Sequence, residues 1–184
     1  MPLLEHEYDR RGDPRDLQQD VSHEYLGRAV AQYITTLAAH RKITIPSHSA
    51  YLALAAGDAI PECAFASALS IPFSNVTLVD RKIDPEIQQL LHPGIQTVRS
   101  GLFTYLRDTT AKFGFITMIG GDYIVYPRNR LETLIELLSR VTEPGALVCV
   151  ETDLRNDPTL PWQTKGFTSP DDHYDMLKVF SGQA

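Results

Sequence analysis

The stretch Ala50-Tyr-Leu-Ala-Leu-Ala-Ala-Gly-Asp-Ala59 decides the fold class of this chain. It opens with a short apolar run, Ala50 to Leu54, which is typical of a buried strand. The small residues Ala55 to Ala59 then predict a tight turn, and segment 61–69 has the composition of a helix. A strand, a turn and a helix in this order indicate the first unit of a parallel α/β fold.

The same alternation continues along the chain. We expect helices at 21–40, 84–91 and 128–141, and further strands at 75–79, 95–99, 113–119 and 146–150. Because these strands are apolar on both faces and helices separate them, the sheet should be parallel and covered on both sides. The sequence thus predicts an α/β fold with a mostly parallel sheet of about five strands, helices on both faces and a helix before the first strand.

The bulk composition suits one domain with charged ends. The 184 residues are 43% hydrophobic and 22% charged, which is enough apolar material for a core. The net charge of −6 arises at the two ends, because residues 1–20 and 151–184 each hold six acids and three bases. We predict an exposed charged arm over residues 1–20 and a single domain over residues 21–184.

Several classes of partner and site are disfavoured. The chain has no run of Lys and Arg that would attract nucleic acid. It has no apolar stretch of about 18 residues and no signal-peptide core, so we expect a cytoplasmic protein without a membrane span. Cys63 and Cys149 lie far apart without metal-ligand spacing, and no metal site is predicted.

Two residues near predicted strand ends indicate a ligand site. In a parallel sheet, ligands bind outside the carboxyl ends of the strands. Gly57 follows the first strand, where a backbone without a side chain can approach a ligand closely, and Asp80 ends the second strand. A carboxylate there can accept hydrogen bonds from ribose hydroxyls, which favours a nucleoside-containing ligand. The plainer alternatives are a simple turn at Gly57 and, for Asp80, a capping role or an ion pair with Arg81 or Lys82.

Around these positions, over about residues 25 to 184, the chain resembles the class I S-adenosylmethionine-dependent methyltransferases, which have a Rossmann-like fold. Tyr51 to Ala59 is similar to the family's first strand and the glycine-rich loop beside the methionine part of the cofactor. Leu78-Val-Asp80 resembles the acidic strand end that holds the ribose. Arg99 to Leu102 occupies the position of the loop that frames the adenine.

The resemblance extends to the reaction centre. Phe115 to Asp122 is similar to the fourth strand and the loop that faces the methyl group, and Val141 to Val148 to the turn into the fifth strand. The family relationship implies S-adenosylmethionine as cofactor, with these binding residues: Ala55, Gly57, Asp58, Asp80, Ser100, Gly101, Ile119 and Gly120. A sulfonium already activates the methyl group, so the protein mainly aligns the reactants, and Asp122 is the residue best placed to act as a base.

Two functions follow from this resemblance and from its departures. The first is a methyltransferase that acts on an unidentified, small-molecule acceptor. The glycine loop keeps only Gly57, because Ala55 and Ala59 stand where the family usually places glycines. The alternative is therefore a catalytically inactive methyltransferase-like domain that serves as a binding or assembly module.

The predicted end of the fold differs from the family pattern. Family members continue past the fifth strand into an antiparallel hairpin, whereas segment 167–180, with Ser169 and Pro170 at its start, predicts a helix. By this count the last two strands are missing, and residues 146–150 lie at the edge of the sheet. Residues 152–168, a protein partner or a second copy of the chain should then cover that edge, so a homo-oligomer is expected as one arrangement.

Overall fold

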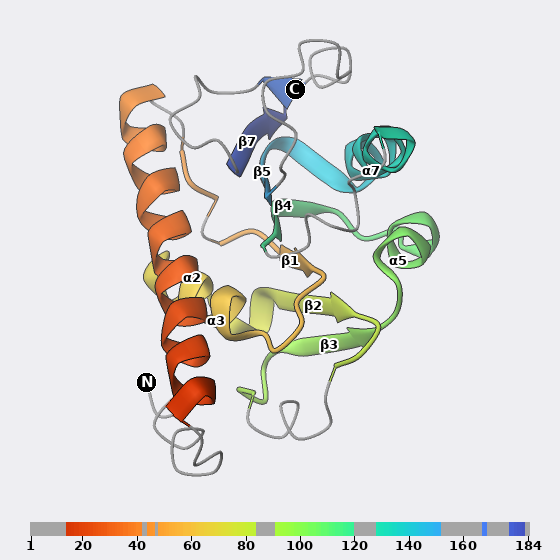
Figure 1. Ribbon diagram of the computed structural model, residues 1–184. Coiled ribbons are helices and arrows are strands. Elements are labelled where there is room, and N and C mark those ends of the chain that lie inside the picture. Colours follow the sequence, from red (N-terminus) through yellow and green to blue (C-terminus); the bar gives the residue numbers. More distant parts are fainter. Residues whose placement is uncertain are drawn as a thin grey trace.

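One sheet of seven strands forms the centre of the molecule (Figure 1). The computed structural model describes residues 14–41, 44–46, 48–83, 91–119, 128–151, 167–168 and 177–182. The strand order is β3-β2-β1-β4-β5-β7-β6, and the first five strands run parallel. The strands are β1 Tyr51–Leu54, β2 Val76–Asp80, β3 Gln96–Arg99, β4 Phe113–Met118, β5 Thr142–Glu151, β6 Phe167–Thr168 and β7 Leu177–Gly182. The predicted α/β fold with a mostly parallel sheet is confirmed.

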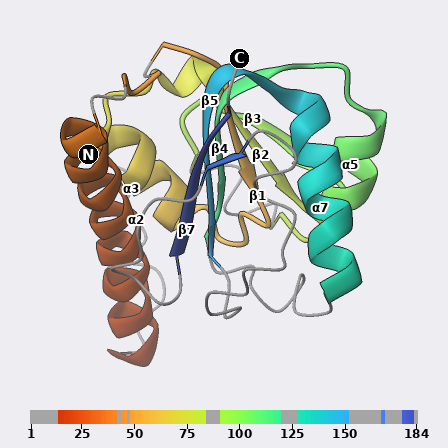
Figure 2. The same cartoon turned by 90° about the horizontal axis from the view of Figure 1, so that it is seen from above.

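Helices cover both faces of the sheet, as the sequence predicts (Figure 2). One layer consists of α2, Pro14–Arg41, and α3, Ile60–Ala68, and the other of α5, Leu102–Asp108, and α7, Arg128–Val141. A short 3-10 helix, Phe73–Asn75, leads into β2. Residues 84–90 of the predicted helix 84–91 lie outside the described residues.

Two apolar cores result from the alternation of side chains along the strands. Leu52 and Leu54 of β1 face the core under α5 and α7, whereas Tyr51 and Ala53 face the core under α2 and α3. All four are fully buried. A strand that is buried on both faces reads as a continuous apolar run, which is why the segment around residues 50–54 predicted a central strand.

The helix before the first strand is longer than predicted. It begins at Pro14, so residues 14–20 of the predicted arm are helical. Proline suits a first helical turn because its fixed φ matches the helix and its missing N–H is not needed there. Among the described helices, none is both long and apolar enough to cross a membrane.

The C-terminal segment corrects the prediction of a missing hairpin. β7 pairs antiparallel with β5, from Leu147 opposite Ser181 to Glu151 opposite Leu177, and β6 pairs antiparallel with β7. The prediction of a sheet edge at 146–150 was therefore wrong, and the predicted helix 167–180 was wrong at its described ends, 167–168 and 177–180, which are strands. Residues 169–176, with Ser169 and Pro170, lie outside the described residues. Leu177-Lys-Val-Phe180 is rich in apolar residues, two of them aromatic or β-branched, and pairing with the backbone of β5 makes it a strand.

Candidate functional site

The carboxyl ends of β1, β2 and β3 meet at one edge of the sheet, where backbone hydrogen bonds join them. The Ala56 N–H donates to the Val79 carbonyl oxygen at 3.3 Å, and the Ser100 N–H donates to the Asp80 carbonyl oxygen at 2.9 Å. The loops after the three strands are therefore held against one another. This is the edge at which the sequence predicted a ligand site.

The loop after β1 has an unusual backbone. Ala55, Gly57 and Ala59 all adopt the left-handed conformation, with φ of 56°, 51° and 62°. Glycine takes this conformation freely, whereas for an alanine it costs roughly 1–2 kcal/mol. The two alanines thus hold the conformation that glycines would favour, although their side chains oppose it. A Cβ added at Gly57 would meet nothing within 4 Å, so the backbone of this residue borders open space.

Asp80 ties the loops after β1 and β2 together. Its Oδ2 accepts a hydrogen bond from the Gly57 N–H at 3.1 Å, and its Oδ1 accepts one from the Lys82 N–H at 2.8 Å. A carboxylate has about four acceptor positions, so two backbone donors leave it able to accept further hydrogen bonds. The predicted pair, Gly57 and Asp80, is brought into direct contact.

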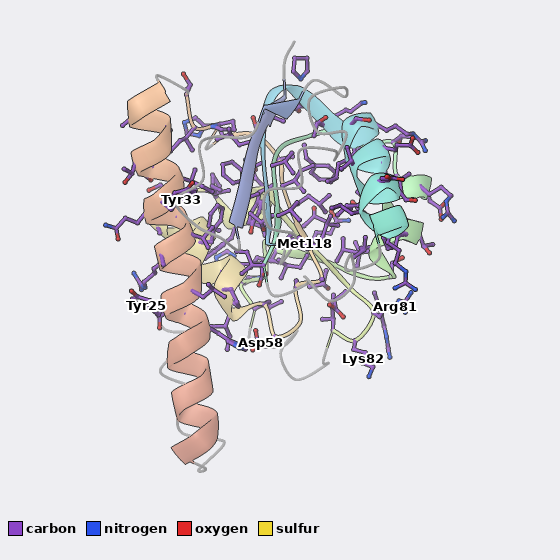
Figure 3. All side chains as sticks on the ribbon, turned by 45° about the horizontal axis from the view of Figure 1, so that its top comes forward. Tyr25, Tyr33, Asp58, Arg81, Lys82 and Met118 are labelled. Carbon is purple, nitrogen blue, oxygen red and sulfur yellow. The ribbon has the colours of Figure 1, made fainter. Side chains whose placement is uncertain are left out.

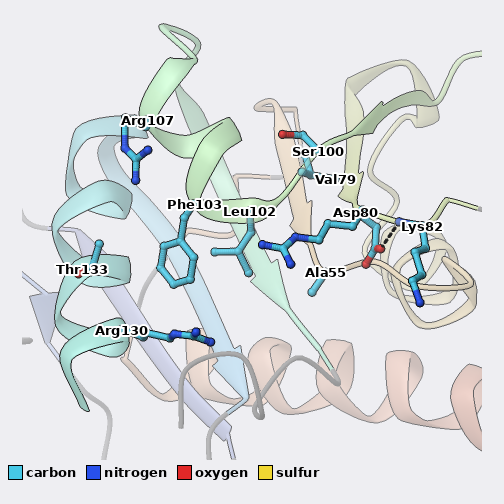
Figure 4. Close-up of a pocket in the computed structure, with 11 residues that line it drawn as sticks. Ala55, Val79, Asp80, Lys82, Ser100, Leu102, Phe103, Arg107, Arg130 and Thr133 are labelled. Atoms are coloured by element: carbon cyan, nitrogen blue, oxygen red, sulfur yellow. Dashed lines mark hydrogen bonds between the residues drawn. The ribbon is translucent and has the colours of Figure 1, made fainter. Parts of the chain in front are cut away.

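A pocket of about 570 Å³ opens beside Asp80 (Figure 4). This volume lies in the range of sites for cofactors and small ligands, about 300–1,000 Å³. The ends of β1, β2 and β3 supply one part of its lining, and α5 and α7 supply the other. The described lining residues are Ala55, Val79, Asp80, Arg81, Lys82, Ser100, Leu102, Phe103, Arg107, Arg130 and Thr133.

The other predicted site residues occupy different places. Gly101 lies under the Arg81 side chain, because an added Cβ would be 3.0 Å from Arg81 Nε. Ile119 is buried in the core under α2 and α3 and does not line the pocket. Gly120 and Asp122 lie outside the described residues.

Asp58 faces the helices rather than the pocket. Its Oδ2 is hydrogen-bonded to Nδ1 of His23 on α2 at 2.7 Å, and its Oδ1 accepts from the Ile60 N–H at 3.1 Å. In Figure 3 Asp58 lies near α2, whereas Arg81 and Lys82 lie farther from that helix. Asp58 therefore joins the loop to α2 and to the start of α3.

A buried polar pair lies behind the site. Tyr51 Oη and Thr117 Oγ1 are 2.7 Å apart, on the neighbouring strands β1 and β4. Burial raises the pKa of the Tyr51 hydroxyl well above its ordinary value, and the charge of Glu62 raises it further. Tyr51 therefore stays protonated and serves as a packed, hydrogen-bonded core residue.

The sequence reasoning missed the helical half of the pocket. Phe103 and Arg107 lie four residues apart on α5, and Arg130 and Thr133 lie three residues apart on α7. These spacings place each pair on one helix face, and this spacing is the feature of the sequence that could have revealed the helical half of the pocket. Only the packing of both helices on the same side of the sheet brings the two faces to one pocket.

Comparisons with known proteins give a fold but no close relative. No family model and no curated protein matches the chain. Among solved structures, 1,6-didemethyltoxoflavin-N1-methyltransferase from Burkholderia thailandensis, which holds S-adenosylhomocysteine, has a TM-score of 0.63 and 16% identity over 99% of this chain and 88% of its own. The Escherichia coli protein yhhF, described as a candidate methyltransferase, has a TM-score of 0.59 and 17% identity over 85% of each chain.

A third structure, an O-methyltransferase family protein from Burkholderia thailandensis, has a TM-score of 0.59 and 10% identity. The match covers 92% of this chain but only 61% of that protein. All three identities are low, so the likeness shows the fold alone. The antiparallel strands β7 and β6 supply the last two strands that the sequence predicted to be missing. The chain thus has the Rossmann-like fold of S-adenosylmethionine-dependent methyltransferases, as the resemblance of its sequence implied.

Proposed function

We propose that this protein is a methyltransferase that binds S-adenosylmethionine at the ends of β1, β2 and β3 and acts on a small-molecule acceptor. The observation that carries the proposal is the placement of Asp80, which ends β2, lines a pocket of cofactor size and retains acceptor capacity. The S-adenosylhomocysteine held by one of the similar structures, which is the demethylated form of that cofactor, supports the assignment.

The residues of the pocket have distinct roles in this proposal. Asp80 accepts hydrogen bonds from the ribose hydroxyls, while Gly57 and Lys82 hold its carboxylate in place. Ala55 lets the ligand approach the backbone closely, and Ser100 borders the base. When bound, the cofactor supplies a methyl group activated by its sulfonium, so the protein chiefly orients donor and acceptor.

The geometry of the β1 loop bears on the alternative of an inactive, merely structural domain. If the loop had no ligand to accommodate, the left-handed alanines Ala55 and Ala59 would carry a conformational cost without use. The retained loop conformation favours a domain that still binds its cofactor. Activity on an acceptor then separates a methyltransferase from a module that binds the cofactor without using it.

Isothermal titration calorimetry with S-adenosylmethionine and S-adenosylhomocysteine tests the proposal. We expect both ligands to bind and Asp80→Ala to weaken them at least tenfold, since hydrogen bonds to a charged group contribute about 1.5–3 kcal/mol. Asp80→Asn keeps one carbonyl acceptor and should weaken binding less. Asp108→Asn alters an exposed acid outside the pocket lining and is the matched control.

The outcomes separate the two functions. No heat with either ligand at millimolar concentration would refute cofactor binding and with it the proposal. If the cofactor binds, transfer of a labelled methyl group to a small-molecule acceptor identifies an enzyme, whereas binding without transfer to any acceptor supports the inactive module.

A further inference from the structure

His23 extends the buried face of α2 to the loop after β1. The buried positions of this helix recur at helical spacing and include Gly27, Val30, Ile34 and Ala38. His23 lies one turn before Gly27, so it belongs to the same face, and its side chain is 33% exposed. Where the rest of this face packs on the domain through apolar and small residues, His23 brings a polar group toward the loop.

A hydrogen bond joins His23 to Asp58 across the gap between α2 and the loop. His23 Nδ1 lies 2.7 Å from Asp58 Oδ2, and because a carboxylate only accepts hydrogen bonds, Nδ1 is the donor. The Asp58 side chain is 23% exposed, so the pair is partly shielded from water, where such a bond is stronger than at an open surface. Oδ1 accepts from the Ile60 N–H at 3.1 Å. Both carboxylate oxygens of Asp58 are therefore bonded on the helix side of the loop.

The loop after β1 is thus held from two opposite sides at adjacent residues. The Gly57 N–H is bonded to Asp80, which lines the pocket, whereas the next residue, Asp58, is bonded to His23 on α2 (Figure 3). A planar peptide bond joins Gly57 to Asp58, so a displacement of Asp58 also moves the backbone of Gly57. The placement of the Asp80 carboxylate therefore depends in part on His23, although His23 is not among the described lining residues of the pocket.

The conformation of this loop makes such outside ties necessary. Ala55 and Ala59 are left-handed, with φ of 56° and 62°, and alanine adopts this conformation only at a cost in free energy. Backbone conformations of this kind persist where the surrounding structure over-determines them. The bonds at Gly57 and Asp58 lie between the two alanines in the sequence. They are therefore placed to keep the whole loop in a conformation that it would not hold unaided.

We propose that His23 is a positioning residue of the cofactor site: acting through Asp58, it holds the loop after β1 in the conformation that binds S-adenosylmethionine. This inference deepens the proposed function and rests on it for the identity of the ligand. The plainer alternative is that the bond only fastens α2 to the domain. A fastening contact changes the stability of the protein, whereas a positioning residue also changes its affinity for the ligand.

Calorimetry with S-adenosylmethionine and S-adenosylhomocysteine separates these two roles. His23→Leu removes the donor and should weaken the binding of both ligands at least fivefold. His23→Asn places an amide N–H near the position of Nδ1 and should keep the affinity within twofold of that of the unaltered protein. Ile34→Val removes a buried methyl group from the same face of α2 and is the matched control. It should lower the melting temperature and leave the affinity unchanged.

A double-mutant cycle tests whether His23 acts through Asp58. Asp58→Ala alone should weaken both ligands at least fivefold, and His23→Leu added to it should weaken them by less than a further twofold, because its partner is already gone. A full additional loss in the double variant would show that His23 acts by another route and would overturn the positioning role. The same loss of affinity in Ile34→Val as in His23→Leu would overturn it as well.

Amide hydrogen exchange without ligand measures the tie separately from the cofactor. The Gly57 amide, which is bonded to Asp80, should exchange at least fivefold faster in His23→Leu but not in Ile34→Val. If it does so and neither ligand binds the unaltered protein, the proposed function fails while His23 still holds the loop. If both ligands bind and His23→Leu binds them as tightly as the unaltered protein, the positioning role is refuted and the proposed function stands.

Discussion

Single residues at the end of β1 show how this chain forms a glycine-type loop with few glycines. Ala55 and Ala59 hold left-handed backbone conformations, and Gly57 lies between them with the same sign of φ. The surrounding structure enforces these conformations: the Ala56 N–H donates to Val79, and the Gly57 N–H donates to Asp80. Tertiary hydrogen bonds thus offset a local preference of alanine against this backbone.

Replacing these alanines by glycine should stabilise the protein. We expect Ala55→Gly to raise the free energy of unfolding by about 1 kcal/mol, because it relieves the left-handed strain. Ala59→Gly should gain less, since the Ala59 methyl group is buried. Urea denaturation measures the free energy of unfolding of both variants. The control is Ala39→Gly at an exposed position of α2, which should lower the free energy of unfolding by about 1 kcal/mol. If Ala55→Gly lowered the free energy of unfolding as much as the control does, Ala55 would not be strained in the folded protein.

Tyr51 predicts a pH dependence of stability. Burial raises its pKa in the folded protein above the unfolded value of about 10, so the stability linked to its proton is present below that pH and is lost as the pH rises above it. Tyr51→Phe should cost about 1–3 kcal/mol at pH 7, because Thr117 loses its partner. It should also make the fall in stability above pH 10 shallower.

Denaturation curves between pH 7 and pH 11 check this prediction. Tyr25 has an exposed fraction of 72%, and Tyr25→Phe provides the control, with a pH profile like that of the unaltered protein. A profile for Tyr51→Phe that runs parallel to the unaltered one above pH 10 would show that Tyr51 ionises freely in the folded state.

At the scale of elements, the packing of α2 on α3 depends on one small residue. Gly27 lies within α2, and an added Cβ would overlap the carbonyl oxygen of Pro61 at the start of α3. The close approach also lets Asp58, in the loop before α3, reach His23 on α2. The sequence pattern predicted both helices, but it could not show that Gly27 sits at their contact.

Gly27→Ala should destabilise the protein although alanine favours helices. Helix propensity alone predicts a gain of about 1 kcal/mol, whereas overlap with the backbone of α3 should cost more, for a net loss of about 2 kcal/mol. Thermal denaturation shows whether the variant is more or less stable than the unaltered protein. Gln32→Ala, at an exposed position of the same helix, should change stability by less than about 0.5 kcal/mol. A higher stability of Gly27→Ala would show that α2 and α3 can move apart to accept the methyl group without a cost in free energy.

At the scale of the whole molecule, β7 closes the side of the sheet that the sequence left unpaired. It lies against β5 along five paired positions, and β6 adds a short strand beyond it. A parallel sheet whose fifth strand stayed open would present unpaired backbone groups to other chains. The antiparallel partner removes that liability from within the chain.

A chain that ends at residue 176 should therefore be less stable and self-associate. Loss of the backbone hydrogen bonds to β5 should cost on the order of 3 kcal/mol or more, at about 1 kcal/mol each. Size-exclusion chromatography with light scattering measures the association, and urea denaturation measures the stability. A chain that ends at residue 182 retains β7 and is the control. Unchanged stability and mass in the shorter chain would refute the role of β7.

The parallel part of the fold could be predicted because local pattern and burial coincide there. Central strands are apolar on both faces, so Tyr51–Leu54 and Phe113–Met118 are recognisable without knowledge of their neighbours. The same holds for α7, whose apolar residues recur at helical spacing. Segment 177–182 could not be assigned in this way, because its strand conformation depends on pairing with β5.

By itself the sequence determined the α/β class, the parallel order of elements and the pair Gly57 and Asp80, since turn chemistry and a carboxylate at a strand end are local features. Only the tertiary structure decided that Ala55 and Ala59 adopt glycine-like conformations, that Asp58 turns to His23, and that the basic residues of α5 and α7 meet at the pocket. Those outcomes depend on which segments, distant in the chain, are packed against one another, and no local pattern encodes that proximity.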